Sequence, residues 1–340
     1  MEKIKIFFRR LRGMSLKKMW RIVRQVHQDS GKPSILIFLD MVYCAIVYGV
    51  GYQDYQVFGF AHIRGKKKRR TFMTMNDNLS VVRTMNDRNV SRLFVDKCEF
   101  NRRFSSYIGR EYLDLRECTF EEFDRFLQGK TAVFAKTVDN FGGKGIAKLE
   151  LEQFPDHRLL YRMMLAGKQY LVEECIRQDA RMSSLCASSV NTIRIVTLVQ
   201  DGQVHIMYSL IRIGDGKRFV DNISSDGMYC PVDENGVLCK PAFCDATGEY
   251  YETHPYTGAK LLGFQIPCFH QALEMVKRAA LEIKEVRYVG WDVAISENGP
   301  LLVEGNTIPG YDMCQNYYHL GEEKIGIYPK FKQVMGDRIA

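Results

Sequence analysis

The sequence predicts an α+β protein with a helical N-terminal extension. Two helical patterns lie in the first 85 residues, whereas short β-branched strands alternate with amphipathic helices from about Asn86 onward. Asp201-Gly202 separates two apolar runs, and Asn298-Gly299 separates two more. These dipeptides favour tight turns between antiparallel strands. We therefore expect antiparallel hairpins packed with helices after Asn86.

The basic charge of the protein is concentrated at its N-terminus. Residues 1–32 contain ten Lys and Arg side chains against Glu2 and Asp29, while the other 308 residues hold 38 basic and 38 acidic side chains. This balance argues against a nucleic-acid-binding body. Apolar residues from Ile4 to His27 have helical spacing, and the segment 31–33 (Gly-Lys-Pro) ends the pattern. The arm either lies on an anionic membrane surface or stays solvated or docked on the body.

Residues 35–50 form the most apolar run of the chain. Its 16 residues fall short of the about 20 needed to span a bilayer, and Asp40 lies near its middle. We expect a buried helix that ends near Gly49. The basic run 66–70 predicts a solvated loop, with a nuclear localisation signal as the weaker alternative.

Ten cysteines are scattered without a C-x-x-C pair, which is typical of reduced thiols in a cytoplasmic protein. Cys230, Cys239, Cys244 and His254 do not have the spacing of a zinc site. No signal-peptide pattern follows the basic start. We expect a cytoplasmic protein, with peripheral contact to the inner membrane face through residues 1–32 as an open alternative.

A glycine-rich loop follows a predicted strand over 132–136. The strand ends at Lys136, and a second strand begins at Ile146. The end of the loop consists of Gly142, Gly143, Lys144 and Gly145. Glycines allow backbone amides to approach a ligand closely, and the lysines add positive charge, so the loop suits a polyphosphate. A plain turn is the alternative.

Two further stretches carry candidate site residues. The strand 170–172 opens into Glu173, Glu174, Cys175 and Ile176, whose backbone groups could pair with an adenine edge; an edge strand that ends in acids is the alternative. Arg194 and Arg212 lie on an expected antiparallel strand pair, where solvated arginines are the alternative. A long helix over 269–286 follows.

The hairpin 289–310 concentrates hard oxygen ligands. Its expected strands are 291–295 and 301–304, with Asp292 near the start of the first and Glu304 at the end of the second. Positions equally far from the turn face each other, and Asn306 shares the face of Glu304 by the two-residue period. Two carboxylates and a carboxamide suit Mg²⁺ or Mn²⁺. A surface hairpin with solvated acids is the alternative.

The order of these motifs over residues 86–316 resembles the ATP-grasp superfamily. Three segments resemble its sugar-transfer-associated, alpha-L-glutamate-ligase-related branch. They are SSVNTIRIVTL, VDNISSDGMYCPVD and GWDVAISENGPLLVEGNTIPG. The resemblance implies two α/β lobes that clasp ATP, at 86–172 and 173–340, behind a basic helical region at 1–85.

The resemblance also implies nucleotide and metal ligands. Lys97 and Lys136 match lysines that bind the nucleotide and its phosphates, and Gly142–Gly145, with Lys144, match the flexible loop. Glu173–Ile176 match the adenine hinge, with the Glu174 carbonyl and the Ile176 N–H as its contacts. Gln178 or Asp179 would approach the ribose. The Mg²⁺ ligands are matched by Asp292, Glu304 and Asn306.

The implied catalytic residues are Arg212, Asn222 and Arg194. Arg212 and Asn222 resemble groups that contact the transferred phosphate, and Arg194 is a further candidate. Many ligases of the superfamily have an arginine where this chain has Gly290. Either Arg194 or Arg212 compensates for it, or the acceptor chemistry differs.

The implied activity is an ATP- and Mg²⁺-dependent carboxylate–amine ligase that works through an acyl phosphate. By analogy it joins an amino acid to a sugar or a cell-surface polysaccharide precursor. The alternatives are a phosphotransferase on the same fold, a non-catalytic nucleotide-binding partner in polysaccharide assembly, and a membrane scaffold.

Overall fold

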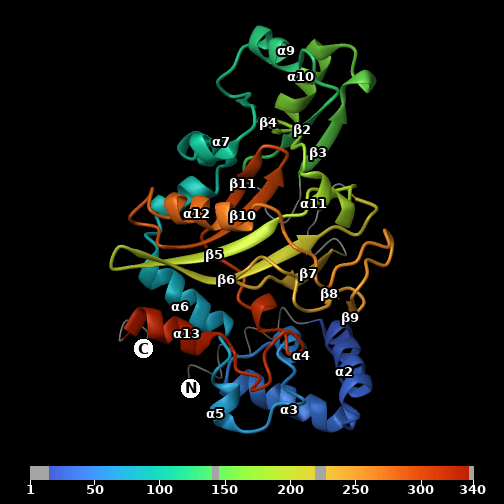
Figure 1. Cartoon of the computed structure of the whole chain (residues 1–340), viewed down its shortest axis with the longest axis vertical. Helices are drawn as coiled ribbons and strands as arrows, with labels where there is room; N and C mark the ends of the chain where they lie inside the picture. The colour runs from blue at the N-terminus through green and yellow to red at the C-terminus, as the bar shows by residue number, and fades with distance from the viewer. Residues whose placement is uncertain (1–14, 140–144, 219–226, 337–340) are drawn as a thin grey trace. The chain divides into compact units, whose positions relative to one another are not determined.

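The computed structural model describes residues 15–139, 145–218 and 227–336 (Figure 1). The chain divides into two units, Asn86–Thr307 and a second unit made of Met1–Met85 with Ile308–Ala340. The unit Asn86–Thr307, called the mixed unit below, thus begins where the sequence pattern changes from helices alone to strands alternating with helices. The C-terminal segment, however, packs with the helical unit and not with the expected lobe 173–340, which is a correction to the predicted domains.

The helical unit contains five helices from the N-terminal part of the chain and two short ones from the C-terminal part, among the residues described. They are α2 (Leu16–Ser30), α3 (Ser34–Val47), α4 (Tyr52–Val57), α5 (Lys66–Arg69), α6 (Met75–Met85), η4 (Met313–Gln315) and α13 (Tyr328–Met335). The expected break after the first helix is confirmed, because α2 ends at Gly31 with a φ of 68°.

Gln315 binds the two chain segments of this unit together. Its side-chain Oε1 accepts from the backbone N–H groups of Met73 at 2.8 Å and Ile327 at 3.0 Å, and its Nε2 donates to the carbonyls of Met73 and Tyr311. The amide is fully buried, so its whole hydrogen-bonding capacity is used inside the protein. Residues 308–340 are therefore an integral part of the unit.

Two expectations for this unit were wrong. The helix α3 buries only one side, with Ile37, Met41 and Cys44, whereas a buried helix was expected. The basic run 66–70 is not a solvated loop but contains the one-turn helix α5, in which Arg69 forms an ion pair with Asp40 at 2.6 Å. This ion pair neutralises the Asp40 carboxylate, the acidic group that argued against α3 as a membrane span.

The mixed unit is α+β, and its strands form two antiparallel sheets. The four-stranded sheet has the order β1-β4-β2-β3, with β1 (Tyr112–Asp114), β2 (Ala132–Lys136), β3 (Ile146–Glu150) and β4 (Leu171–Glu174). The seven-stranded sheet has the order β11-β10-β5-β6-β7-β8-β9, with β5 (Ile193–Gln200), β6 (Gln203–Ile213), β7 (Met228–Pro231), β8 (Ala242–Cys244), β9 (Glu249–Tyr251), β10 (Tyr288–Ser296) and β11 (Gly299–Asn306).

Helices of the mixed unit cover these sheets (Figure 1). They are η1 (Val90–Phe94), α7 (Lys97–Arg103), α8 (Ser105–Ile108), α9 (Phe120–Leu127), η2 (Leu151–Gln153), α10 (His157–Ala166), α11 (Ala180–Leu185) and α12 (Phe269–Ala279). α9 begins with the expected capping box of Thr119 and Glu122. α12 ends at Ala279, before the expected Val286, which instead forms a β-bridge with Asn86.

The core of the seven-stranded sheet includes residues from before the first strand. Phe94 and Phe104 pack on the fully buried Trp291, with ring centroids 6.0 and 5.4 Å apart. The four-stranded sheet has a separate core around Phe123 and Val133. Segment 90–108 therefore belongs to the larger sheet, although it precedes the smaller one in the chain.

Candidate functional site

A row of charged side chains crosses three adjacent strands of the larger sheet. Asp292 on β10 lies opposite Arg194 on β5 and opposite Glu304 on β11. The expected facing of the two carboxylates is therefore present in the register. A bulge follows Asp292, where Val303 is the additional residue of β11. The turn glycine Gly299 has a φ of 110°, as its position in the hairpin requires.

Two arginines hold the Asp292 carboxylate. Arg194 donates from Nε to Oδ1 at 2.5 Å, and Arg212 donates from Nη2 to Oδ2 at 2.7 Å. Arg212 is fixed in turn by the hydroxyl of Thr192 at 2.7 Å. Burial raises the pKa of Asp292, but both arginines outweigh this effect and hold the pKa at about 2. The carboxylate is completely buried and ionised near neutral pH.

Glu304 lies opposite Asp292 at the edge of this charged group. Burial and the neighbouring Asp292 carboxylate raise the pKa of Glu304. Asn306 donates from Nδ2 to Glu304 Oε1 at 3.3 Å. Side by side, two carboxyl groups and an amide oxygen form a hard donor set that fits Mg²⁺ or Mn²⁺. In the described residues no three His, Cys, Asp or Glu side chains surround a common metal position.

A second charged cluster is centred on Glu173 of the smaller sheet. Its carboxylate accepts from the Lys136 ammonium, from Arg110 Nη2 at 2.6 Å and from Asn101 Nδ2 at 2.8 Å. Burial raises the pKa of Glu173, but Arg110 and Lys136 lower it to about 2. Arg110 also donates to the carbonyl of Leu302 on β11 at 2.7 Å, so it joins the two sheets.

Charges from both clusters act on Lys97. Burial lowers the pKa of its ammonium, and the charges that act on it include Glu304, Lys136 and Glu173. Its backbone N–H donates to the carbonyl of Val138, two residues after the strand that ends at Lys136. The charges of Lys97, Lys136 and Glu304, in the hairpin of β10 and β11, are therefore close enough to affect one another.

The strand that was expected to open at Glu173 continues through Glu174. Glu173 and Glu174 remain in β4, where the Glu174 N–H donates to the carbonyl of Glu111 at 3.0 Å. The Glu173 side chain is part of the ion-pair cluster with Arg110 and Lys136. Among the described residues, the N–H of Ile176 has no backbone acceptor outside the regular helices and strands.

The two residues expected near the ribose have bonds within the chain. Gln178 accepts from the Asn191 N–H at 2.6 Å. Asp179 caps α11 through the Arg181 N–H at 2.9 Å and also pairs with the Arg181 guanidinium at 3.3 Å. The Gln178 amide thus helps position the segment that enters β5, a function its sequence context did not indicate.

Several predicted residues lie outside the described part of the chain. These are Gly142, Gly143, Lys144 and Asn222. Gly145, at the edge of the glycine-rich loop, is described; its φ is 72° and its carbonyl accepts from Thr137 at 3.1 Å. A positive φ here explains a glycine requirement where the loop joins β3.

Sequence reasoning missed a buried polar cluster next to Gly214. Burial raises the pKa of the Cys186 thiol, but hydrogen bonds with His254, Ser188 and Ser189 lower it to about 6. His254 also bonds to the carbonyl of Gly214 at 2.9 Å. The serine pair 188–189 and the HPYTG stretch were visible in the sequence, but nothing local showed that they meet.

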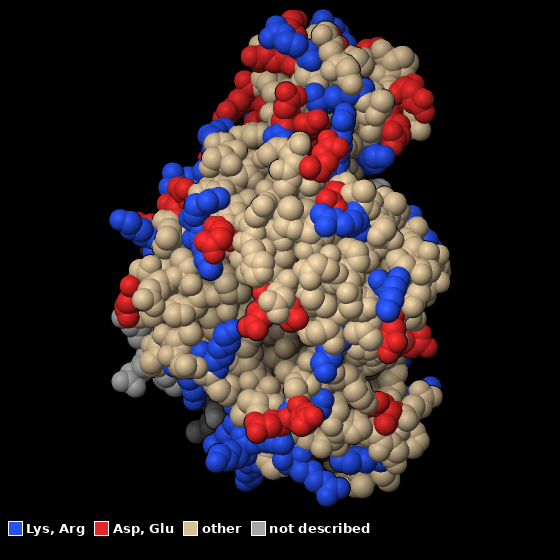
Figure 2. Space-filling model, in the orientation of Figure 1, with Lys and Arg blue, Asp and Glu red and all other residues tan. Residues whose placement is uncertain are grey.

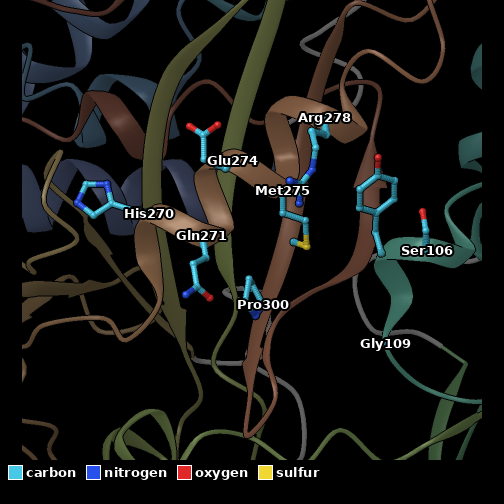
Figure 3. A pocket seen from close by; sticks show the side chains of 9 residues that line it. Ser106, Gly109, His270, Gln271, Glu274, Met275, Arg278 and Pro300 are labelled. Carbon is cyan, nitrogen blue, oxygen red and sulfur yellow. The ribbon is translucent and has the colours of Figure 1, made fainter.

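A separate cavity of about 820 Å³ lies beside α12 (Figure 3). Its walls include Tyr107, Glu274, Arg278 and Pro300. The apolar side of α12 packs on Trp291 and Val293, whereas Asp292 points to the other face of β10 by the two-residue period. The cavity therefore contains none of the predicted site residues.

One family model matches nearly half of the chain. Residues 158–323 match the model of the sugar-transfer associated ATP-grasp family. No curated protein sequence matches this chain.

Several solved structures are similar to the chain at low sequence identity. The D-alanine-D-alanine ligase from Coxiella burnetii is 14% identical with a TM-score of 0.39, covering 72% of this chain and 54% of that one. N5-carboxyaminoimidazole synthetase from Staphylococcus aureus is 12% identical, with a TM-score of 0.43 and coverages of 73% and 53%. The ATP-grasp ligase PsnB is 12% identical, with a TM-score of 0.44 and coverages of 74% and 64%.

This chain therefore spans between 53% and 64% of the length of those three structures. The matched residues 158–323 include strand β4, the arginine-bearing strands β5 and β6, and the hairpin of β10 and β11, so this part of the chain is similar to the sugar-transfer associated ATP-grasp family.

Proposed function

We propose that the protein is an ATP- and Mg²⁺-dependent carboxylate–amine ligase. This proposal rests on the arrangement of charges around the hairpin. The charges of Glu304 and Lys136 act on Lys97, and Asp292 faces both Arg194 and Glu304 across the strands. A carboxylate that approaches a polyphosphate must overcome charge repulsion, which cations placed beforehand reduce. Lys97 and Lys136 would supply such cations, and Asp292, held by its two arginines, would supply a carboxylate for the metal.

The proposed reaction has two steps. The substrate carboxylate attacks the γ-phosphorus of ATP, the bond from that phosphorus to the bridging oxygen breaks, and ADP leaves with its electron pair. An amine then attacks the acyl phosphate carbon, phosphate leaves, and the amine loses a proton to give an amide. Bound Mg²⁺ would supply charge neutralisation to the phosphates, with Asp292, Glu304 and Asn306 as its protein ligands.

The other predicted residues have proposed roles in binding and positioning. Arg212 and Arg194 orient Asp292, and Arg212, with Asn222, meets the transferred phosphate. Lys136 binds phosphate by exchanging its Glu173 partner for ATP oxygens. The Glu174 carbonyl and the Ile176 N–H hold the adenine, with Gln178 or Asp179 towards the ribose. The loop that contains Gly142, Gly143, Lys144 and Gly145 covers the phosphates.

We also propose that the acceptor is a sugar or a polysaccharide precursor and that the carboxylate comes from an amino acid. The family description, which refers to sugar transfer, supports this choice. A cytoplasmic location is part of the proposal, because none of the ten cysteines forms a disulfide. Peripheral contact of residues 1–32 with the inner membrane face would bring the enzyme to a lipid-linked acceptor.

The test is an ADP-release screen with the purified chain, MgATP, pooled amino acids and pooled sugar amines, followed by mass spectrometry. An amide product that appears with ADP supports the ligase. A stable phosphorylated product would instead identify a phosphotransferase. Glu304→Gln should abolish ADP release, while the matched control Glu297→Gln, an exposed acid of the same hairpin, should retain it.

A further inference from the structure

The helix α3 leaves a broad apolar face uncovered within the helical unit. Six large side chains on this helix are exposed: Ile35 (59%), Leu36 (56%), Leu39 (55%), Tyr43 (38%), Ile46 (46%) and Val47 (40%). They recur at intervals of three and four residues, so they form one stripe along the helix. A contiguous apolar surface of this kind marks an interaction site, whereas single exposed apolar residues do not.

α2 extends the same surface. The Trp20 ring stacks on Phe38 of α3 with centroids 5.5 Å apart and planes 3° from parallel. Trp20 itself is 44% exposed, and Leu16, one turn earlier, is 61% exposed. Trp at the border of an apolar surface is typical of contact with a membrane interface.

Positive charge flanks the stripe on two sides. Exposed cations lie on α2, at Lys17, Lys18, Arg21 and Arg24, and on or beside α5, at Lys66, Lys67, Lys68 and Arg70. The bidentate pair of Arg69 with Asp40, at 2.7 and 2.6 Å, holds α5 against α3. Figure 2 shows Lys and Arg side chains gathered over the part of the helical unit that contains α3 and α5 in Figure 1.

Acidic side chains are scarce in this part of the chain. Residues 15–70 contain eleven Lys and Arg side chains and three acidic ones. Of the three, Asp40 is paired with Arg69, and Asp29 contacts His62 at 2.7 Å. The surface around the stripe is therefore strongly cationic.

We propose that the α3 stripe is a docking site for an anionic lipid surface. α3 lies in the plane of the bilayer boundary, with Leu36, Leu39 and Tyr43 among the acyl chains and the cations of α2 and α5 at the level of the phosphates. A second copy of the chain fits this face less well, because its cations would oppose cations.

The helix geometry favours lying on the bilayer over crossing it. α3 has 14 residues, about 21 Å at the helical rise, against a hydrocarbon thickness of about 30 Å. Among the described residues no single helix has the length and composition of a membrane span; only α2 and α3 together reach it, and they are bent by 115°. The inference does not depend on the proposed ligase activity.

The test is sedimentation of the full chain with phosphatidylcholine vesicles, with and without phosphatidylglycerol. We expect binding to the anionic vesicles and a partition coefficient at least ~10-fold lower for Leu39→Asp with Ile46→Asp. Leu159→Asp with Met163→Asp, on the exposed side of α10, is the matched control and should bind like the unchanged chain; both of its positions are more than half exposed.

Trp20 fluorescence is an independent measure of the contact between the α3 stripe and the vesicle. The other tryptophan, Trp291, is fully buried, so a vesicle-induced blue shift of emission should come from Trp20 and disappear in Trp20→Phe. Lys66→Glu with Lys67→Glu should weaken binding to anionic vesicles in a protein with unchanged circular dichroism.

Three outcomes would overturn the proposal. The first is no binding to anionic vesicles, and the second is equal binding of the Leu39→Asp, Ile46→Asp variant. The third is light scattering that shows a dimer which this variant dissociates, because a second copy would then cover the stripe.

Discussion

Arg194 faces Asp292 directly across the β5–β10 strand pair, and its Nε reaches Oδ1 at 2.5 Å. Arg212 reaches the other oxygen of the same carboxylate. Gly290, two residues before Asp292, has no side chain to do so. The two arginines come from strands β5 and β6, and together they keep Asp292 ionised while it is buried.

Removal of Arg194 should destabilise the protein strongly. Arg194→Met leaves the buried Asp292 with one cation in place of two, which should cost roughly 3–5 kcal/mol of unfolding free energy. Urea unfolding checks this value, and a double-mutant cycle with Asp292→Asn isolates the pair. Arg177→Met is the control, because the Arg177–Glu297 pair is exposed and 3.9 Å long. Equal effects of the two substitutions would contradict the role given to Arg194.

Loss of one candidate metal ligand should weaken metal–nucleotide binding. For Asn306→Leu we expect Mn²⁺ affinity, measured by electron paramagnetic resonance in the presence of ATP, to fall by about tenfold or more. Asn298→Leu, in the turn of the same hairpin, should leave the affinity unchanged. Unaltered Mn²⁺ binding in Asn306→Leu would remove this residue from the ligand set.

Glu173 should support the smaller sheet as the common partner of two cations. Glu173→Gln leaves Arg110 and Lys136 buried without a counter-charge and should lower the unfolding free energy by roughly 3–5 kcal/mol. Glu111→Gln is the control, since that acid is exposed and bonds to Lys130 at 2.7 Å. If Glu173→Gln unfolds at the same urea concentration as the unchanged chain, the cluster is not structural.

The same carboxylate predicts a pH dependence of stability. The pKa of Glu173 is about 2 in the fold against 4.5 ordinarily, so its contribution is complete above about pH 4.5. The contribution should be lost as the pH falls from about 4.5 to about 2, because the unfolded chain binds the proton first. Melting temperatures measured over this range should fall less steeply in Glu173→Gln. Parallel curves for the two proteins would contradict the low pKa.

The C-terminal segment should be required for the helical unit. Gln315→Met removes four hydrogen bonds, three of them buried, and leaves the N–H groups of Met73 and Ile327 without their acceptor, which should cost about 2–4 kcal/mol. Thermal unfolding followed by circular dichroism measures the loss. Glu322→Ala, at an exposed position in the same segment, is the reference and should melt like the unchanged chain.

The sequence by itself determined the local features of this protein. The two-residue period and the Asn298-Gly299 turn predicted that Asp292 and Glu304 face each other, because strand pairing next to a tight turn is a local property. The strand 132–136 and the capping box of Thr119 follow from side chains within a few residues.

Only the tertiary structure decided which charges meet. Arg194 is 98 residues from Asp292, and Glu173 is 63 residues from Arg110, so these pairs depend on strand order and sheet contact. The return of residues 308–340 to the helical unit and the exposed stripe of α3 also depend on packing between distant segments. Periodicity shows that a helix has apolar faces, but the available partners determine which face is buried.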